Sequence, residues 1–432
     1  MKKNKNAFTL IELLAVIAIL AIILVIAIPR ILDVIETSKI NTLKNAVKLI
    51  ADSAEKKYTE NEAFGEENEI TCESVSKLNK EDYSKCTIIF DENGIAKVSI
   101  LGRGKFKGLK VIEATKTSAE VIKLEAPKYG ITAVEYIKQQ YEYDGDGLKI
   151  DNTPDANIRY YGSNPNNYVK FNNELWRIIG VFDNNVKLMR KNYLGWFSWD
   201  SSDSNVNNGK GINQWGESTD EEGNYYPGAK LQVYLNKRYY GGDTTVLCYN
   251  ADNNTLACPT STLDEASKSL IDNHTWNTGA IEYKTRTDTL AFYQDERGTK
   301  KGKNCISSDN CNDNIIRTTE WTGYIGLPYV TDWAYASGES ICEVNMIKED
   351  NREYICNRNN WMPKGLWFWT LSPGLNNKDS NIVWGLFSYA NVTDRFANYN
   401  TAFFPAIYLK SNVKIESGNG SESNPYILKA GV

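Results

Sequence analysis

The 432-residue sequence is poor in the residue types on which most catalytic and metal sites depend. It contains one histidine, His274, and no nucleophile motif lies near it in Asp272-Asn273-His274-Thr275-Trp276. A Ser-His-Asp or Cys-His site would rest on that single side chain, so we expect no enzyme of these classes. Pairs of carboxylates for glycoside hydrolysis stay open, because their separation is not readable from a sequence. Overall we predict a non-enzymatic protein without a cofactor.

Concentrated positive charge is also missing. The formal net charge is −5 and the mean hydropathy is −0.46, so most of the chain is soluble material without the basic face of a nucleic-acid binder. Direct contact with nucleic acid is therefore not expected. The C-terminal end has no LPxTG sequence followed by an apolar tail, so we do not expect wall sorting to anchor the chain.

One apolar run stands out, from Phe8 to Ile28. It contains a single ionisable residue, Glu12, and neither glycine nor proline. A helix of about 20 such residues crosses a hydrocarbon layer of roughly 30 Å. No comparable run follows, and three lysines precede it, which predicts a single-pass protein with a cytoplasmic N-terminus and an extracellular C-terminal part.

Three kinds of segment could account for this run. A cleaved secretory signal has a shorter apolar region and a small-x-small cleavage site, whereas this run ends in Ala27-Ile28-Pro29. A simple signal anchor would have this length, but it does not require a carboxylate such as Glu12. A carboxylate within a spanning segment costs about 2.5–3.5 kcal/mol at the centre and less near an edge, so it indicates a function.

The third kind of segment is indicated by the residues around Glu12. The stretch Ala7-Phe8-Thr9-Leu10-Ile11-Glu12, after a short basic leader, resembles the processing site of type IV pilins and pseudopilins. The resemblance implies cleavage between Ala7 and Phe8 by a prepilin peptidase, N-methylation of Phe8, and a role for Glu12 in recognition and assembly. The family usually has glycine at the position of Ala7, which predicts slower cleavage here. Pro29 also matches a proline often found in pilin helices.

The spacing of Glu12 suggests how it would act in assembly. Cleavage would create a cationic α-amino group on Phe8, one helical turn before Glu12. Both groups would be poorly solvated at the membrane edge, so each favours pairing with the other, in the same subunit or a neighbour. Pairing between subunits would set the axial register of a filament.

The chain after the apolar run predicts a fold of the α+β class. Pro29 should bend the helix without ending it, and apolar residues continue at helical spacing to about Tyr58. Short alternating segments, Thr87–Phe90 and Ala96–Ile100, flank a turn at Asp91-Glu92-Asn93-Gly94. We therefore expect a leader (1–7), a transmembrane and amphipathic helix (8–60), a small pilin-like domain with an antiparallel sheet (61–126), a linker (127–157) and a large β-rich extracellular domain (158–432).

Eight cysteines fall into four close neighbouring pairs, without Cys-x-x-Cys spacing. With one histidine in the chain, zinc ligation is a poor explanation, and disulfides formed in an oxidising extracellular compartment fit better. Eight cysteines allow 105 pairings. Local spacing favours Cys72–Cys86, Cys248–Cys258, Cys305–Cys311 and Cys342–Cys356.

Composition shifts after about residue 126, and all eleven tryptophans lie from Trp176 onward. The pattern predicts a short helix at 132–141 and strands at 168–171, 174–182, 186–190, 366–371, 382–389, 406–409 and 424–428. Segments around Glu174–Gly180, Trp369–Pro373 and Pro405–Ser411 resemble an extracellular module of surface proteins of Gram-positive bacteria, a resemblance that implies no known activity.

The tryptophans of this region have two possible roles. Exposed aromatic side chains with many Tyr and Asn would suit a surface that binds a glycan or a protein, while buried ones would fill a core. We expect most to be core, although two of them, Trp367 and Trp369, would share one face of a strand. The residues considered for the binding surface are Trp196, Trp199, Trp367, Trp369 and Trp384.

These observations lead to one hypothesis with one alternative. We expect a minor or tip subunit of a type IV pilus or pseudopilus-like filament, since roughly 270 extra residues would crowd a helical shaft. Its partners would be the prepilin peptidase and methylase, other pilin subunits, the cell membrane and a surface glycan or protein. The alternative is a single-pass membrane-anchored surface adhesin that does not assemble.

Overall fold

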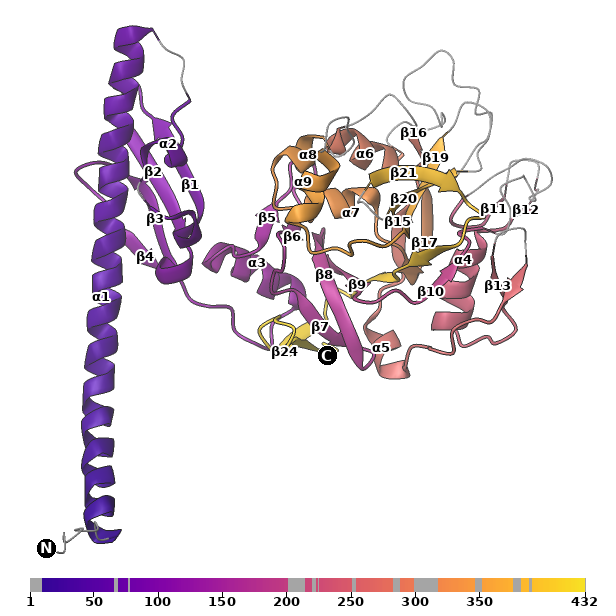
Figure 1. Ribbon diagram of the computed structural model, residues 1–432, viewed down its shortest axis with the longest axis horizontal. Helices are drawn as coiled ribbons and strands as arrows, with labels where there is room; N and C mark the ends of the chain where they lie inside the picture. The colour runs from indigo at the N-terminus through magenta and orange to yellow at the C-terminus, as the bar shows by residue number, and fades with distance from the viewer. Residues whose placement is uncertain are drawn as a thin grey trace, which may run out of the picture. The chain divides into compact units, whose positions relative to one another are not determined.

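A computed structural model of the chain describes two compact units (Figure 1). The first consists of Met1–Ala126 and Glu142–Asp146, and the second of Pro127–Tyr141 and Gly147–Val432. The structure describes residues 10–65, 69–76, 78–200, 214–219, 223, 225–250, 254–282, 288–298, 318–345, 352–375, 382–387 and 391–431.

The first unit is built on one helix, α1 (Leu10–Phe64), which is 55 residues long. In its C-terminal half a single stripe of side chains is buried. Because an α-helix has 3.6 residues per turn, residues three and four apart lie on the same face. The side chains of this stripe are Leu43, Val47, Ile50, Ala51 and Ala54.

This stripe packs against a four-stranded antiparallel sheet in the order β1-β2-β3-β4. Figure 1 shows the strands beside the C-terminal half of α1. Val98, Ile100 and Val111 point from the sheet into the shared core. The expected arrangement, a long helix packed on a small antiparallel sheet, is confirmed. The strands are β1 (Tyr83–Phe90), β2 (Ala96–Gly102), β3 (Leu109–Ala114) and β4 (Val121–Lys123).

The predicted turn between the first two strands is present. Asp91 Oδ1 accepts hydrogen bonds from the backbone N–H groups of Asn93 and Ile95, at 2.9 and 3.0 Å. Gly94 has a φ of +73°, a conformation that glycine adopts at little cost. The remaining short helices of this unit are α2 (Cys72–Val75), η1 (Lys80–Asp82) and η2 (Gly104–Phe106).

The second unit contains two larger sheets. The nine-stranded sheet has the path β18-β23-β9-β8-β7-β25-β24, with β6 pairing β8 and β5 pairing β6. Within it, β25 and β7 run parallel. The bounds are β5 (Leu148–Ile150), β6 (Ile158–Tyr160), β7 (Tyr168–Phe171), β8 (Glu174–Phe182), β9 (Asn185–Arg190), β18 (Ile325–Gly326), β23 (Ala406–Tyr408), β24 (Lys414–Ser417) and β25 (Tyr426–Lys429).

The six-stranded sheet has the path β10-β22-β19-β20-β21, with β16 pairing β19. Its strands are β10 (Gly195–Phe197), β16 (Ile281–Glu282), β19 (Phe368–Leu375), β20 (Ile382–Phe387), β21 (Asn391–Phe396) and β22 (Thr401–Phe403). Three further strand pairs lie within the described residues: β11 (Ser218–Thr219) with β12 (Tyr225–Tyr226), β13 (Cys248–Tyr249) with β14 (Thr255–Leu256), and β15 (His274–Asn277) with β17 (Glu320–Gly323).

Short helices connect and cover these sheets. The first, α3, contributes Ala133, Val134 and Ile137 to the core of the second unit, although it lies in the range predicted as a linker. The helices are α3 (Ala133–Tyr143), α4 (Lys230–Val233), η3 (Tyr234–Tyr240), α5 (Glu265–Leu270), α6 (Thr289–Glu296), α7 (Val330–Tyr335), α8 (Ile341–Val344) and α9 (Arg352–Arg358).

Disulfides join neighbouring segments in both units. Cys72 bonds to Cys86 in the first unit, while Cys248 bonds to Cys258 and Cys342 to Cys356 in the second. These are three of the pairs that local spacing favoured, and the β-rich, disulfide-containing character of the second unit is confirmed. The fourth pair, Cys305–Cys311, lies outside the described residues.

Candidate functional site

The N-terminal half of α1 differs from its C-terminal half in having no cover. Leu10, Ile11 and Val25 are each more than 70% exposed, and the apolar side chains between them are about half exposed or more where the structure describes them. No element of the first unit lies beside this part of the helix in Figure 1. Leaving an apolar surface of this extent in water is unfavourable, so we expect a membrane or another apolar surface to cover it.

This exposed half also meets the requirements of a membrane span. Within the described part of the chain, α1 is the one helix long and apolar enough to cross a membrane. At a rise of 1.5 Å per residue, about 20 residues cover the roughly 30 Å of a hydrocarbon core. The segment therefore has the character of a membrane or surface anchor at the N-terminus of the protein.

Pro29 lies inside α1, which continues on both sides of it. The missing N–H of proline removes one hydrogen bond of the helix without ending it. The expectation that the helix passes through Pro29 is confirmed.

Of the three residues predicted for processing and assembly, the structure describes the backbone of one, Glu12. Ala7 and Phe8 lie outside the described residues. Glu12 is in the first turn of α1, and its side chain lies outside the described part of the structure. Their roles stay predictions.

Comparison with known proteins bears on this segment. Residues 2–28 match the family model described as the prokaryotic N-terminal methylation motif. The chain carries a prepilin-type N-terminus. No curated protein and no solved structure matches the chain. The resemblance of the second unit to a module of Gram-positive surface proteins gains no support from these comparisons.

The tryptophans considered for a binding surface divide into two groups. Trp199, Trp369 and Trp384 are buried in the core of the second unit, as expected for most of them. Trp196 and Trp367 are 41% and 39% exposed. The prediction that Trp367 and Trp369 share one strand face is wrong, because β19 begins at Phe368 and Trp367 precedes the regular strand.

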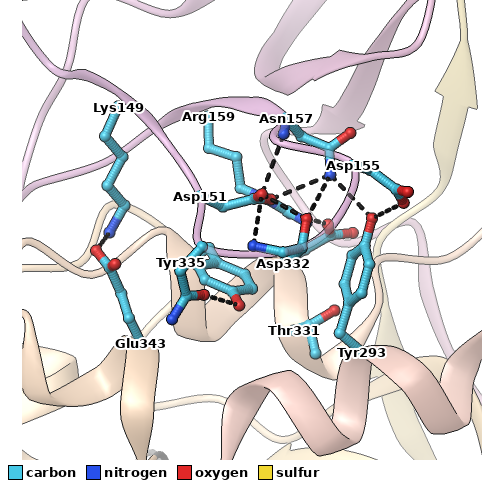
Figure 2. Close-up of polar contacts among 12 residues, drawn as sticks. Lys149, Asp151, Asp155, Asn157, Arg159, Tyr293, Thr331, Asp332, Tyr335 and Glu343 are labelled. Atoms are coloured by element: carbon cyan, nitrogen blue, oxygen red, sulfur yellow. Dashed lines mark hydrogen bonds and ion pairs between the residues drawn. The ribbon is translucent and has the colours of Figure 1, made fainter.

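A group of buried charges lies in the second unit and was not predicted (Figure 2). The Arg159 side chain is 1% exposed and donates from Nε to Asp151 Oδ2 at 2.5 Å and from Nη1 to Asp332 Oδ1 at 2.8 Å. Asp151 also accepts from the side chains of Thr153 and Asn157. The second carboxylate oxygen of Asp332 accepts from Lys187 Nζ at 2.6 Å. Two cations and two carboxylates thus balance one another, and each of the four side chains is at most 1% exposed.

The cluster shifts the proton affinities of its members. Burial alone would raise the pKa of Asp151, but attraction to Arg159 and hydrogen bonds to the charged form leave it lowered. The pKa of Asp332 is lowered in the same way, against its burial, by Lys187 and Arg159. Burial lowers the pKa of Lys187 to about 8 and raises that of Glu296 to about 7.

The sequence contains one signal for this cluster. Lys187 stands within Val186-Lys187-Leu188-Met189, and Arg159 stands between Ile158 and Tyr160, so each is a cation inside an apolar strand. A charge at such a position is buried where both faces of the sheet are covered, and buried charges need partners. The identity of those partners required the fold, since Arg159 and Asp332 are 173 residues apart.

The contacts of His274 are those of a residue that packs and hydrogen-bonds within the fold. Its ring stacks on Tyr408 with centroids 3.7 Å apart, and Nδ1 lies 3.2 Å from Asp272 Oδ2. Burial lowers its pKa. The contacts that the structure describes for His274 include no serine hydroxyl and no thiol.

Proposed function

We propose that this protein is a subunit of a type IV pilus or pseudopilus-like surface filament, of the minor or tip kind. The observation that carries the proposal is the coincidence of the methylation motif at residues 2–28 with a helix whose apolar N-terminal half is uncovered. The motif accounts for processing by a prepilin peptidase. The exposed apolar half of α1 would lie in the membrane first, and after assembly it would pack among the helices of other subunits.

Glu12 is the residue proposed to direct assembly. It is the single ionisable residue between Phe8 and Ile28, and it lies one turn after the amino group that cleavage at Ala7–Phe8 would create. An ion pair between Glu12 of one subunit and this amine of the next would fix their axial offset. The pair would be favoured because neither charge has good solvation near the membrane edge.

The second unit is proposed to be the displayed part. It has its own aromatic core and two large sheets, so it can fold as a body that α1 tethers to the membrane or filament. The half-exposed Trp196 and Trp367 are candidates for contact with a surface glycan or protein.

The first experiment is mass spectrometry of the mature N-terminus from the native membrane or sheared-surface fraction. A chain that begins at N-methylated Phe8 supports prepilin processing. A chain that still begins at Met1 contradicts it and favours the second candidate, a single-pass surface adhesin that does not assemble. Replacing Ala7 with glycine, the usual residue of the family, should increase the processed fraction.

A pair of variants separates insertion from assembly. Glu12→Ala should remain in the membrane fraction and fail to enter filaments. Asp33→Ala is the matched control, since Asp33 is an exposed carboxylate of the same helix beyond the apolar run. Filaments with normal Glu12→Ala content would contradict the role of Glu12, and loss of filaments in both variants would show that the effect is not specific.

A further inference from the structure

One lysine and one carboxylate are in contact in the interior of the second unit. Lys187 is in β9 and Asp332 in the first turn of α7, and both side chains have an exposed fraction of 0%. Lys187 Nζ lies 2.6 Å from Asp332 Oδ2. The carboxyl carbon is at most one C–O bond further away, so an amine and a carboxyl group are held almost in contact.

The surroundings of Lys187 are aromatic. Its Nζ lies 3.9 Å from the ring centroid of Tyr329, 5.3 Å from that of Trp276 and 5.4 Å from that of Tyr408. Among the described residues, Asp332 is the one hydrogen-bond acceptor of this amine. A lysine that is desolvated in this way is easier to deprotonate, and the neutral amine is the nucleophilic form.

The carboxyl group is oriented from its other side. Arg159 Nη1 donates to Asp332 Oδ1 at 2.8 Å, and the backbone N–H of Tyr329 donates to Oδ2 at 2.9 Å. Both donors point at the oxygens on which negative charge would develop if a nucleophile added to the carboxyl carbon. Fixed donors of this kind stabilise a tetrahedral oxyanion.

We propose that Lys187 and Asp332 form an intramolecular amide bond. The ammonium of Lys187 gives one proton to the carboxylate, and the free lone pair of Nζ adds to the carboxyl carbon of Asp332. The tetrahedral intermediate then loses one carboxyl oxygen, which takes a second proton from Nζ and leaves as water. One N–C bond forms, one C–O bond breaks, and the three protons of the ammonium end as one amide N–H and one water molecule.

The buried position makes the condensation favourable. In water, the hydration of the separate ammonium and carboxylate opposes amide formation, but this pair has already lost that hydration. The amide replaces two buried charges by a neutral group. Asp151 and Arg159 remain as one matched pair at 2.5 Å. Glu296, fully buried and held by the hydroxyl and N–H of Thr331 beside Asp332, adds a carboxyl group that carries a proton near neutral pH.

The bond would fix β9 to the start of α7 across 145 residues of sequence. It would hold the nine-stranded sheet to α7 independently of the disulfides. This inference does not depend on assembly into a filament.

The test is peptide mass spectrometry of the full-length chain, extracted from membranes in folded form, reduced and digested with trypsin. The bond predicts one linked species that joins Ile178–Arg190, uncleaved after Lys187, to Thr318–Lys348, lighter than the sum of the two peptides by one water. Lys149 and Glu343 provide an internal control. Lys149 Nζ also lies 2.6 Å from Glu343 Oε1, but these side chains are 15% and 23% exposed. That pair should remain unlinked.

Two variants complete the test. Lys187→Arg keeps a positive charge beside Asp332 and should abolish the linked peptide, and it should also lower the thermal midpoint of the second unit. Lys149→Arg should leave the linked peptide unchanged. A folded wild-type protein that yields mainly free peptides ending at Lys187 would overturn the proposal and leave the pair as an ion pair only. Linkage of Lys149 to the same extent would also overturn it, since burial would then not be the cause.

Discussion

Replacing Arg159 with methionine should destabilise the second unit strongly. The guanidinium is the shared partner of Asp151 and Asp332, and its side chain is 1% exposed. Methionine has a similar length and can fill the space between the rings of Phe182 and Tyr335, which lie 4.6 and 4.7 Å from the guanidinium carbon. The substitution therefore removes the positive charge and keeps most of the side-chain packing.

The loss of stability can be estimated from the interactions that Asp151 would keep. Asp151 would keep its hydrogen bonds to Thr153 and Asn157 but lose its buried cation. Removing one partner of a buried ion pair costs about 3–5 kcal/mol. A domain has a total free energy of unfolding of about 5–15 kcal/mol, so the loss would be a large part of it.

Tryptophan fluorescence during urea unfolding measures this loss selectively, because all eleven tryptophans lie from Trp176 onward. Lys429→Met is the matched control, since Lys429 and Glu416 form an ion pair in which both side chains are more than half exposed. Its unfolding midpoint should be unchanged. An Arg159→Met variant within about 1 kcal/mol of the wild type would refute the view that the buried charges depend on Arg159.

The same variant should change the response to acid. In the wild type the folded-state pKa of Asp151 is lowered. Its contribution to stability is therefore present above its unfolded-state pKa of about 3.9 and is lost as the pH falls through the folded-state value. Without Arg159, burial would raise the pKa of Asp151. The destabilisation of the variant should then be largest near neutral pH and should shrink as acid protonates the carboxylate.

Three further predictions concern other parts of the chain. Leu43→Ala should cost about 2–5 kcal/mol and speed hydrogen exchange in β1–β4, whereas Leu49→Ala, at a position 66% exposed, should have little effect. Replacing both Cys72 and Cys86 with serine should lower the stability of the first unit by roughly 2–3 kcal/mol in chemical unfolding followed by hydrogen exchange. Burial lowers the pKa of His274, so its contribution to the stability of the second unit is present above its usual pKa of about 6.5 and is lost as the pH falls through the folded-state value. In His274→Gln, the stability measured by tryptophan fluorescence should therefore depend less on pH below about 6.5.

Sequence patterns predicted the elements whose periodicity is strong. The strands expected at 168–171 and 174–182 match β7 and β8 at both ends, and β9, β20 and β23 differ from expectation by one or two residues at an end. These strands have continuous or alternating apolar patterns bounded by polar turns, which a local pattern can report. The single long helix was equally clear, although it extends to Phe64 and not only to about Tyr58.

The short helices between residues 214 and 358 were not predicted. Helices such as α4, α7 and α8 have four to six residues, too few for a helical period to be recognised. Isolated helices of this length are not stable in water, so they exist because the surrounding core holds them. In α7, for example, Val330, Trp333 and Ala334 are all fully buried. Their formation depends on contacts with distant segments, which no local pattern contains.

The two halves of α1 show why the chain needs a partner at one end of this helix and not at the other. Leu13, Leu14, Val16 and Ile17 point to all sides of the helix, and each is about half exposed. In contrast, the C-terminal half has one apolar stripe, and its own sheet covers that stripe. A helix that is apolar on all sides is stable only when it is surrounded on all sides. Lipid can surround it, and in the proposed filament the same segments of neighbouring copies would do so. Both environments are apolar, so we expect these side chains to be compatible with either one. Glu12 is the single ionisable residue of the run, and its solvation would differ between the two environments, so we expect its replacement to separate insertion from assembly.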